Sequence, residues 1–143
     1  MSKIEITPEM QQPVVELIKV VDEYQKKKDS FDPKELQDCR DRMSLNLFYC
    51  ADIYSSIRAN AEYSDYERKR NFASEEEGFR NTMGENGKKL TAAQAANQAR
   101  LANKDKEEDC VRSNQRYYKI RLIIDSTTAI LHSISSRLNQ ISK

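Results

Sequence analysis

The sequence contains very little glycine and proline. Its 143 residues include three of each, and there is no tryptophan. Chain reversals depend on glycine and proline, and a sheet protein needs many reversals. The shortage therefore argues against sandwiches, barrels and doubly wound folds, and it favours a few long helices.

Apolar residues are also sparse, whereas charged residues are abundant. They make up 38% and 33% of the chain, and the net charge is +1. This balance suits helices that each bury one narrow apolar stripe and expose the remaining surface. We therefore expect an all-α, elongated helical hairpin or bundle with a long C-terminal helix, which associates into a homo-oligomer.

The cysteines and the hydropathy indicate a reducing, aqueous location. Cys39, Cys50 and Cys110 form no CxxC pair, and an odd number fits no simple disulfide framework. No run approaches 18 apolar residues, and the N-terminal residues lack the apolar centre of a secretion signal. We expect reduced thiols, no membrane contact and a cytoplasmic location, which is the host cytoplasm if a phage encodes the chain.

The sequence shows no arrangement of residues that is typical of an active site. His132 is the sole histidine, no cysteine lies near it in sequence, and we interpret it as a structural or surface residue. The segment GENGKK at 84–89 lacks the spacing of a phosphate-binding loop, and no dinucleotide fingerprint occurs. We expect no enzymatic activity, no cofactor and no metal site.

The first 30 residues predict an N-terminal amphipathic helix. Thr7 followed by Pro8 indicates its start, because a hydroxyl caps a helix and proline fits the first helical position. The apolar stripe recurs at spacings of three and four residues. It consists of Met10, Val14, Leu17, Val21 and Tyr24.

Residues 31–143 predict a helical hairpin. Asp32, Pro33 and Glu35 predict a capping box that begins a helix over about 34–70. One heptad phase of this helix carries the apolar seam that faces a partner. The seam consists of Leu36, Met43, Leu47, Cys50, Tyr54, Ile57 and Ala61.

A flexible connector is predicted between the two arms of the hairpin. Residues 71–90 hold all three glycines, and one helical turn is allowed after Ser74, where Ser74 and Glu77 would form a capping box. Thr91 then begins a long helix over about 92–142, because no glycine or proline follows it.

The C-terminal helix carries an unbroken apolar seam with two possible roles. It can form the hairpin core with the second helix, or it can join copies of the chain. We favour oligomerisation, because the small polar residues between the large apolar ones permit close helix approach. The seam consists of Tyr117, Ile120, Ile124, Thr127, Leu131, Ile134, Leu138 and Ile141.

Two basic clusters are candidate nucleic-acid sites. The first contains Arg58, Arg68, Lys69 and Arg70, with Tyr63, Tyr66 and Phe72 interleaved. Cations contact phosphates and rings stack on unpaired bases, which suits a single strand. The other interpretation is a solvated last helical turn that complements the helix dipole.

The second cluster contains Arg112, Arg116 and Lys119, at spacings of four and three residues on one helix face. It lies in a segment, 112–143, with six basic residues and one acidic residue. One interpretation is a ridge of cations that follows the phosphates of a nucleic acid. The other is charge flanking the apolar seam, which sets how helices pair.

The layout resembles the phage recombination mediator proteins of the UvsY type. The stretch YYKIRLIIDSTTAILHSISSRLNQI, residues 117–141, is similar to that family's closing helix, with the turn from Ile134 to Arg137. Residues 57–72 stand where the family carries a basic motif implicated in contact with single-stranded DNA. The resemblance implies a ring-forming, non-enzymatic protein.

The resemblance also implies partners. Such proteins bind single-stranded DNA and help to load a phage recombinase onto strands coated by single-strand-binding protein, in DNA recombination and repair. The alternative function is a helical phage scaffold, chaperone or adaptor, which acts through coiled-coil contacts with other proteins.

Overall fold

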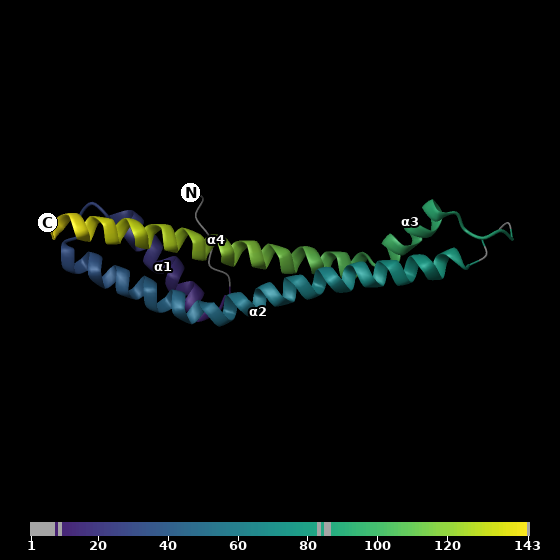
Figure 1. The fold of residues 1–143 in the computed structure, drawn as a ribbon, viewed down its shortest axis with the longest axis horizontal. Coiled ribbons are helices and arrows are strands. Elements are labelled where there is room, and N and C mark those ends of the chain that lie inside the picture. Colours follow the sequence, from purple (N-terminus) through teal and green to yellow (C-terminus); the bar gives the residue numbers. More distant parts are fainter. Residues whose placement is uncertain (1–7, 9, 83, 85–86, 143) are drawn as a thin grey trace. The chain divides into compact units, whose positions relative to one another are not determined.

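The computed structural model describes residues 8, 10–82, 84 and 87–142. Within these residues the chain is all-α, with four helices and no strand (Figure 1). The prediction of an all-α chain with a long C-terminal helix is thereby confirmed. The helices are α1 (Gln12–Lys27), α2 (Pro33–Arg80), α3 (Ala92–Ala102) and α4 (Lys104–Ile141).

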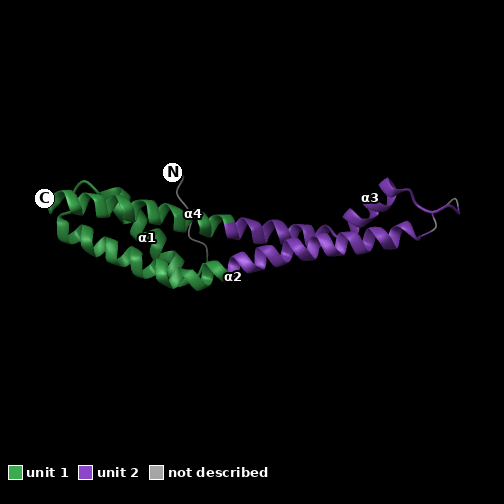
Figure 2. Ribbon diagram, viewed as in Figure 1, with its two compact units in different colours: residues 1–55, 118–143 green, residues 56–117 purple. Residues whose placement is uncertain are grey.

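The helices form two compact units, which Figure 2 shows in different colours. Unit 1 comprises residues 1–55 and 118–143, and unit 2 comprises residues 56–117. Helices α2 and α4 contribute to both units, whereas α1 belongs to unit 1 and α3 to unit 2. The sequence had instead suggested a separate N-terminal segment, 1–30, beside a hairpin, 31–143.

Unit 1 has a core built from three helices, which explains why α1 is not a separate segment. Burial of one large aliphatic side chain stabilises a fold by about 1.5–3 kcal/mol, so this core dominates the stability of the unit. Polar contacts join the same helices: Arg42 Nη1 of α2 lies 3.1 Å from Glu23 Oε2 of α1. The core cluster consists of Val20, Val21, Tyr24, Leu36, Cys39, Met43, Ile134 and Leu138.

Helix α1 begins later than the sequence predicted. Thr7 lies outside the described residues, and Pro8 lies outside the helix, which starts at Gln12 with Pro13 in its first turn. A helix begun at Pro8 would hold Pro13 in its interior, where the missing N–H would cost a backbone hydrogen bond. Proline is tolerated only in the first turn, and this sets the start.

Helix α2 starts as predicted but ends later. The capping box at its start is confirmed, because the Glu35 N–H donates to Asp32 Oδ1 over 2.8 Å. The helix continues past residue 70 to Arg80, so the first half of the predicted connector is helical and Ser74 is no cap. An ion pair stabilises the last turn of the helix: Arg80 Nη2 lies 2.8 Å from Glu76 Oε1, one turn earlier.

The predicted helix over 92–142 is interrupted at Asn103. The capping box at Thr91 is confirmed, but α3 ends at Ala102 and α4 begins at Lys104. Asn103 is buried, and its side-chain Nδ2 and its backbone N–H both donate to the Ala99 carbonyl. An asparagine side chain that bonds to the backbone competes with the helical pattern, which explains the interruption.

Candidate nucleic-acid interface

Most of the predicted basic residues lie in unit 2, on two helices. Arg58 and the run 68–70 lie on α2, and Arg112 and Arg116 lie on α4. Lys119, the last member of the second cluster, belongs to unit 1. Unit 2 is therefore the part of the chain that brings the two predicted clusters together.

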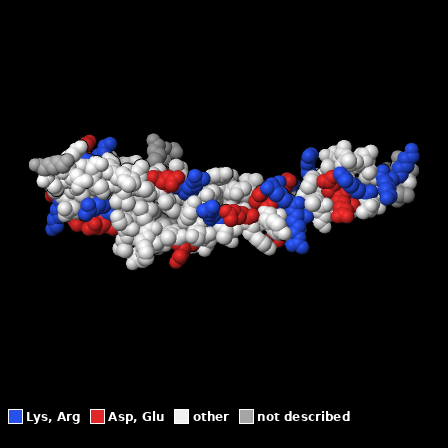
Figure 3. All heavy atoms as spheres, in the orientation of Figure 1, with Lys and Arg blue, Asp and Glu red and all other residues white. Residues whose placement is uncertain are grey.

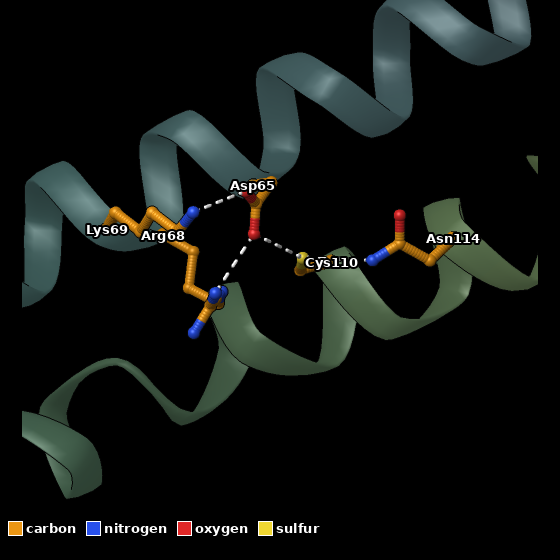
Figure 4. Close-up of polar contacts among 5 residues, drawn as sticks. All are labelled: Asp65, Arg68, Lys69, Cys110 and Asn114. Atoms are coloured by element: carbon orange, nitrogen blue, oxygen red, sulfur yellow. Dashed lines mark hydrogen bonds and ion pairs between the residues drawn. The ribbon is translucent and has the colours of Figure 1, made fainter.

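Polar contacts join α2 and α4 within unit 2 (Figure 4). Ser64 Oγ and Ser113 Oγ lie 3.2 Å apart, and Lys106 Nζ lies 3.7 Å from Glu67 Oε2. The Cys110 thiol of α4 approaches Asp65 Oδ1 of α2 at 4.0 Å. These contacts fix the two helices side by side in this unit.

Asp65 holds two of the four cations of the first cluster (Figure 4). Arg68 Nη2 donates to Asp65 Oδ1 over 2.9 Å, and Lys69 Nζ lies 3.0 Å from Asp65 Oδ2. The hydrogen bond from Arg68, followed by that from Lys69, lowers the pKa of Asp65 below its ordinary value of 3.8. The same contact raises the pKa of Arg68.

Two further cations pair within their own helix. Arg58 Nε lies 3.1 Å from Glu62 Oε1, and Arg112 donates to the Asp109 carboxylate. All four partners of these two pairs are exposed, and screening by water leaves an exposed pair with little net stabilisation. A phosphate can therefore replace the carboxylate at little cost.

Arg70 and Arg116 differ from these cations. Both are exposed, and neither forms an ion pair with any residue that the structure describes. Lys119 is half-buried. Arg70 and Arg116 are therefore the members of the two clusters that present a charge directly to a ligand.

Two tyrosines lie on the same face of α2 as Arg70. The exposed fractions of Tyr63 and Tyr66 are 61% and 59%, and residues 63, 66 and 70 follow helical spacing. The Tyr63 hydroxyl donates to Glu67 Oε1 over 3.1 Å, which orients its ring. Phe72, the third ring of the sequence prediction, is half-buried.

The charge of unit 2 is nearly balanced. Residues 56–117 contain twelve Lys and Arg against eleven Asp and Glu. Figure 3 shows basic and acidic side chains interspersed over the visible face. A ligand with phosphates would therefore be attracted by local groups rather than by a broad positive field.

Several residues of the predicted oligomerisation seam are used inside the chain. Ile120, Ile134 and Leu138 are buried, and the last two pack with α1 and α2 in unit 1. The hairpin-core interpretation therefore applies to them, because a side chain in the core offers no surface to another copy. Tyr117, Ile124 and Leu131 are half-buried, and Ile141 is 55% exposed.

An apolar surface on α2 of unit 1 was not predicted from the sequence. Leu45, Phe48 and Tyr49 are exposed, with Phe48 at 76%. They lie beside Leu47, which the heptad count assigned to the buried seam and which is half-buried. The spacing of 45, 48 and 49 was the available signal, since it marks a second apolar face on the same helix.

Two further kinds of site concern the described residues: metal sites and membrane-spanning helices. In that part of the chain, no three His, Cys, Asp or Glu side chains lie together in an arrangement that would hold a metal ion. None of its helices combines the length and the apolar character that crossing a membrane requires.

Comparison of the chain with protein-family models, with curated proteins and with solved structures found no match.

Proposed function

We propose that the chain is a non-enzymatic protein that binds single-stranded DNA and acts as a recombination mediator. In this role it helps to load a recombinase onto strands coated by single-strand-binding protein. The resemblance of residues 117–141 to the closing helix of UvsY-type proteins supports this function. The observation that carries it is the face of α2 in unit 2 that exposes Tyr63, Tyr66 and Arg70 together.

This face has the two kinds of group that hold a single strand. The rings of Tyr63 and Tyr66 stack on unpaired bases, and stacking contributes about 1–3 kcal/mol per base. Arg70 contacts phosphate directly, and Arg68 and Lys69 exchange the Asp65 carboxylate for phosphate. Sequence preference is weak, because every base offers a flat face to a ring.

The modest charge of one chain suits a mediator. A net charge of +1 gives each chain weak electrostatic attraction to a strand. Several chains on one strand add their contacts, so avidity replaces the affinity of a single site. A strand held by many weak contacts is released stepwise, which suits transfer to a recombinase.

Fluorescence anisotropy with a labelled oligothymidine tests this function. We expect binding that weakens steeply between 50 and 200 mM salt, since phosphate contacts release counterions. The triple variant Arg68→Ala, Lys69→Ala, Arg70→Ala is expected to weaken binding at least tenfold. The matched control removes three cations elsewhere, at Lys26, Lys27 and Lys28 near the end of α1, and is expected to change binding much less.

The two variants together decide the assignment. Equal losses in both would mean that only total charge matters and that the α2 face is no site. An unchanged affinity in the triple variant would exclude the first cluster. A parallel variant with Arg112→Ala and Arg116→Ala measures the contribution of the second.

A second candidate function is a helical scaffold, chaperone or adaptor that binds another protein. The balanced charge of unit 2 and the pairing of its cations favour this alternative. It predicts no affinity for the oligonucleotide at physiological salt, so the same titration distinguishes the two functions.

A further inference from the structure

Unit 1 carries an apolar face on α2 that is bordered by acids. Leu45, Phe48 and Tyr49 are 52%, 76% and 52% exposed, and the rings of Phe48 and Tyr49 touch with their centroids 5.9 Å apart. Asp41 lies one turn before Leu45, and Asp52 lies one turn after Phe48; both are exposed. We call these five residues the α2 acidic face.

Such a cluster is unusual at a surface that stays in water. Three large apolar side chains within one helical turn form a contiguous patch, and burial of each against a partner would be favourable. An aromatic pair at the centre of a patch with a charged rim is the arrangement of a protein–protein contact site. The acidic rim repels phosphates, so a nucleic acid is a poor occupant.

The same unit carries a second apolar face, on α4. Tyr118 and Leu122 lie one turn apart and are 63% and 47% exposed. Lys119 and Arg121 accompany them, and Arg121 Nε lies 3.7 Å from Asp125 Oδ2 in an exposed, exchangeable pair. We call Tyr118, Lys119, Arg121 and Leu122 the α4 basic face.

The α2 acidic faces of two copies are a poor match for each other. If two copies met antiparallel about the midpoint of Leu45 and Phe48, Asp41 of each copy would stand level with Asp52 of the other. If they met parallel, each acid would stand level with itself. Both arrangements oppose like charges, which is unfavourable at an interface.

The α4 basic face is the complementary surface. An antiparallel contact that sets Tyr49 level with Leu122 of another copy also sets Asp52 level with Lys119. In the same register Arg121 stands level with residue 50 and therefore lies within one helical turn of Asp52. Apolar groups then meet apolar groups, and opposite charges meet at the rim.

We propose that a second copy of this chain covers the α2 acidic face with its α4 basic face. The contact is heterologous, so each chain uses one face and leaves the other for the next copy. Repetition of such a contact gives a ring where the rotation closes and an open filament where it does not. This assembly replaces the predicted one, whose seam residues Ile134 and Leu138 are buried within the chain.

Light scattering coupled to gel filtration, without nucleic acid, tests the proposal separately from strand binding. The wild-type chain is expected to run as a multiple of the 16.6 kDa chain mass, and the average mass is expected to rise with concentration. Phe48→Asp and Leu122→Asp are each expected to give single chains. Leu101→Asp is the control, because Leu101 is 71% exposed but lies on α3 of unit 2, and it is expected to assemble as the wild type does.

A mixture of the two variants gives the sharpest result. Phe48→Asp retains an intact α4 basic face and Leu122→Asp retains an intact α2 acidic face. A heterologous contact therefore predicts one-to-one pairs of twice the chain mass and nothing larger. A contact between like faces predicts instead that one variant assembles on its own and that the two variants form no mixed pair.

Three outcomes would overturn the proposal. They are wild-type chains that stay single at all concentrations, Phe48→Asp chains that assemble normally, and a mixture that does not pair. Circular dichroism checks that both variants remain helical, and Leu45→Ser with Tyr49→Ser provides a second disruption of the α2 acidic face without added charge.

Discussion

Arg68 donates to Asp65 over 2.9 Å, three residues back along the same helix. Lys69 contacts the other oxygen of that carboxylate at 3.0 Å. One acid therefore pairs with two of the four cations in the first cluster that the sequence predicted to bind DNA. This relationship makes Asp65 a competitor of any phosphate that approaches α2 in unit 2.

Replacement of that competitor should strengthen strand binding. Asp65→Asn removes the negative charge and keeps the shape of the side chain, so Arg68 and Lys69 become available to phosphate. Because a solvent-screened ion pair on a helix surface contributes little stability, we expect affinity to rise by up to about fivefold in oligothymidine titrations. Asp22→Asn, which frees Lys26 on α1, is the matched control. A weaker affinity in Asp65→Asn would contradict the competition.

Unit 2 should open more readily than unit 1. Within the described part of unit 2, the buried apolar residues are alanines and one cysteine: Ala61, Ala95, Ala99 and Cys110. Unit 1 buries leucine, valine, isoleucine and methionine, and local stability follows the apolar contact that each region makes. Hydrogen exchange followed by mass spectrometry should show faster exchange over 56–80 and 104–117 than over 36–50 and 123–138. Equal protection of the two units would disprove this expectation.

The core of unit 1 should be sensitive to truncation. Met43 and Ile134 are fully buried, so Met43→Ala or Ile134→Ala should lower the free energy of unfolding by about 2–5 kcal/mol. Urea denaturation followed by circular dichroism measures the change. Leu101→Ala serves as control because Leu101 is 71% exposed, and its effect should stay within about 0.5 kcal/mol. A small effect at Ile134 would contradict the hairpin core.

The buried thiol of Cys50 should make the folding stability of unit 1 decrease at alkaline pH. Burial raises the pKa of its thiol from 9.0 to about 11. The folded state therefore keeps the proton that the unfolded state loses, so this stabilisation is complete below pH 9 and is lost as the pH rises towards 11. Urea midpoints should fall more between pH 8 and pH 10.5 for the wild type than for Cys50→Ala.

Thiol labelling provides an independent check on Cys50. The reactive species is the thiolate, so the buried, protonated Cys50 should react slowly at pH 8 in the folded chain and fast in urea. Peptide mapping after a short exposure to an alkylating reagent measures how much Cys50 is modified in each state. Rapid modification of Cys50 in the folded chain would show that the residue is not buried in solution.

The sequence by itself determined the helices and much of their local detail. The shortage of glycine and proline, the three- and four-residue spacings and the capping boxes at Asp32 and Thr91 all act between near neighbours. They were therefore visible without a structure. Two errors were also local in cause: Pro13 displaced the start of α1, and the Asn103 side chain interrupted the C-terminal helix.

The tertiary structure alone decided which face of each helix is covered. Periodicity shows that Ile134 and Leu138 share a face, but only contact with α1 and α2 makes that face a core rather than a surface for another copy. Arg137 Nη1 of α4 donates to the Tyr24 hydroxyl of α1 over 3.4 Å, a contact between residues far apart in sequence. Such contacts depend on how the helices pack, and helical spacing carries no information about them.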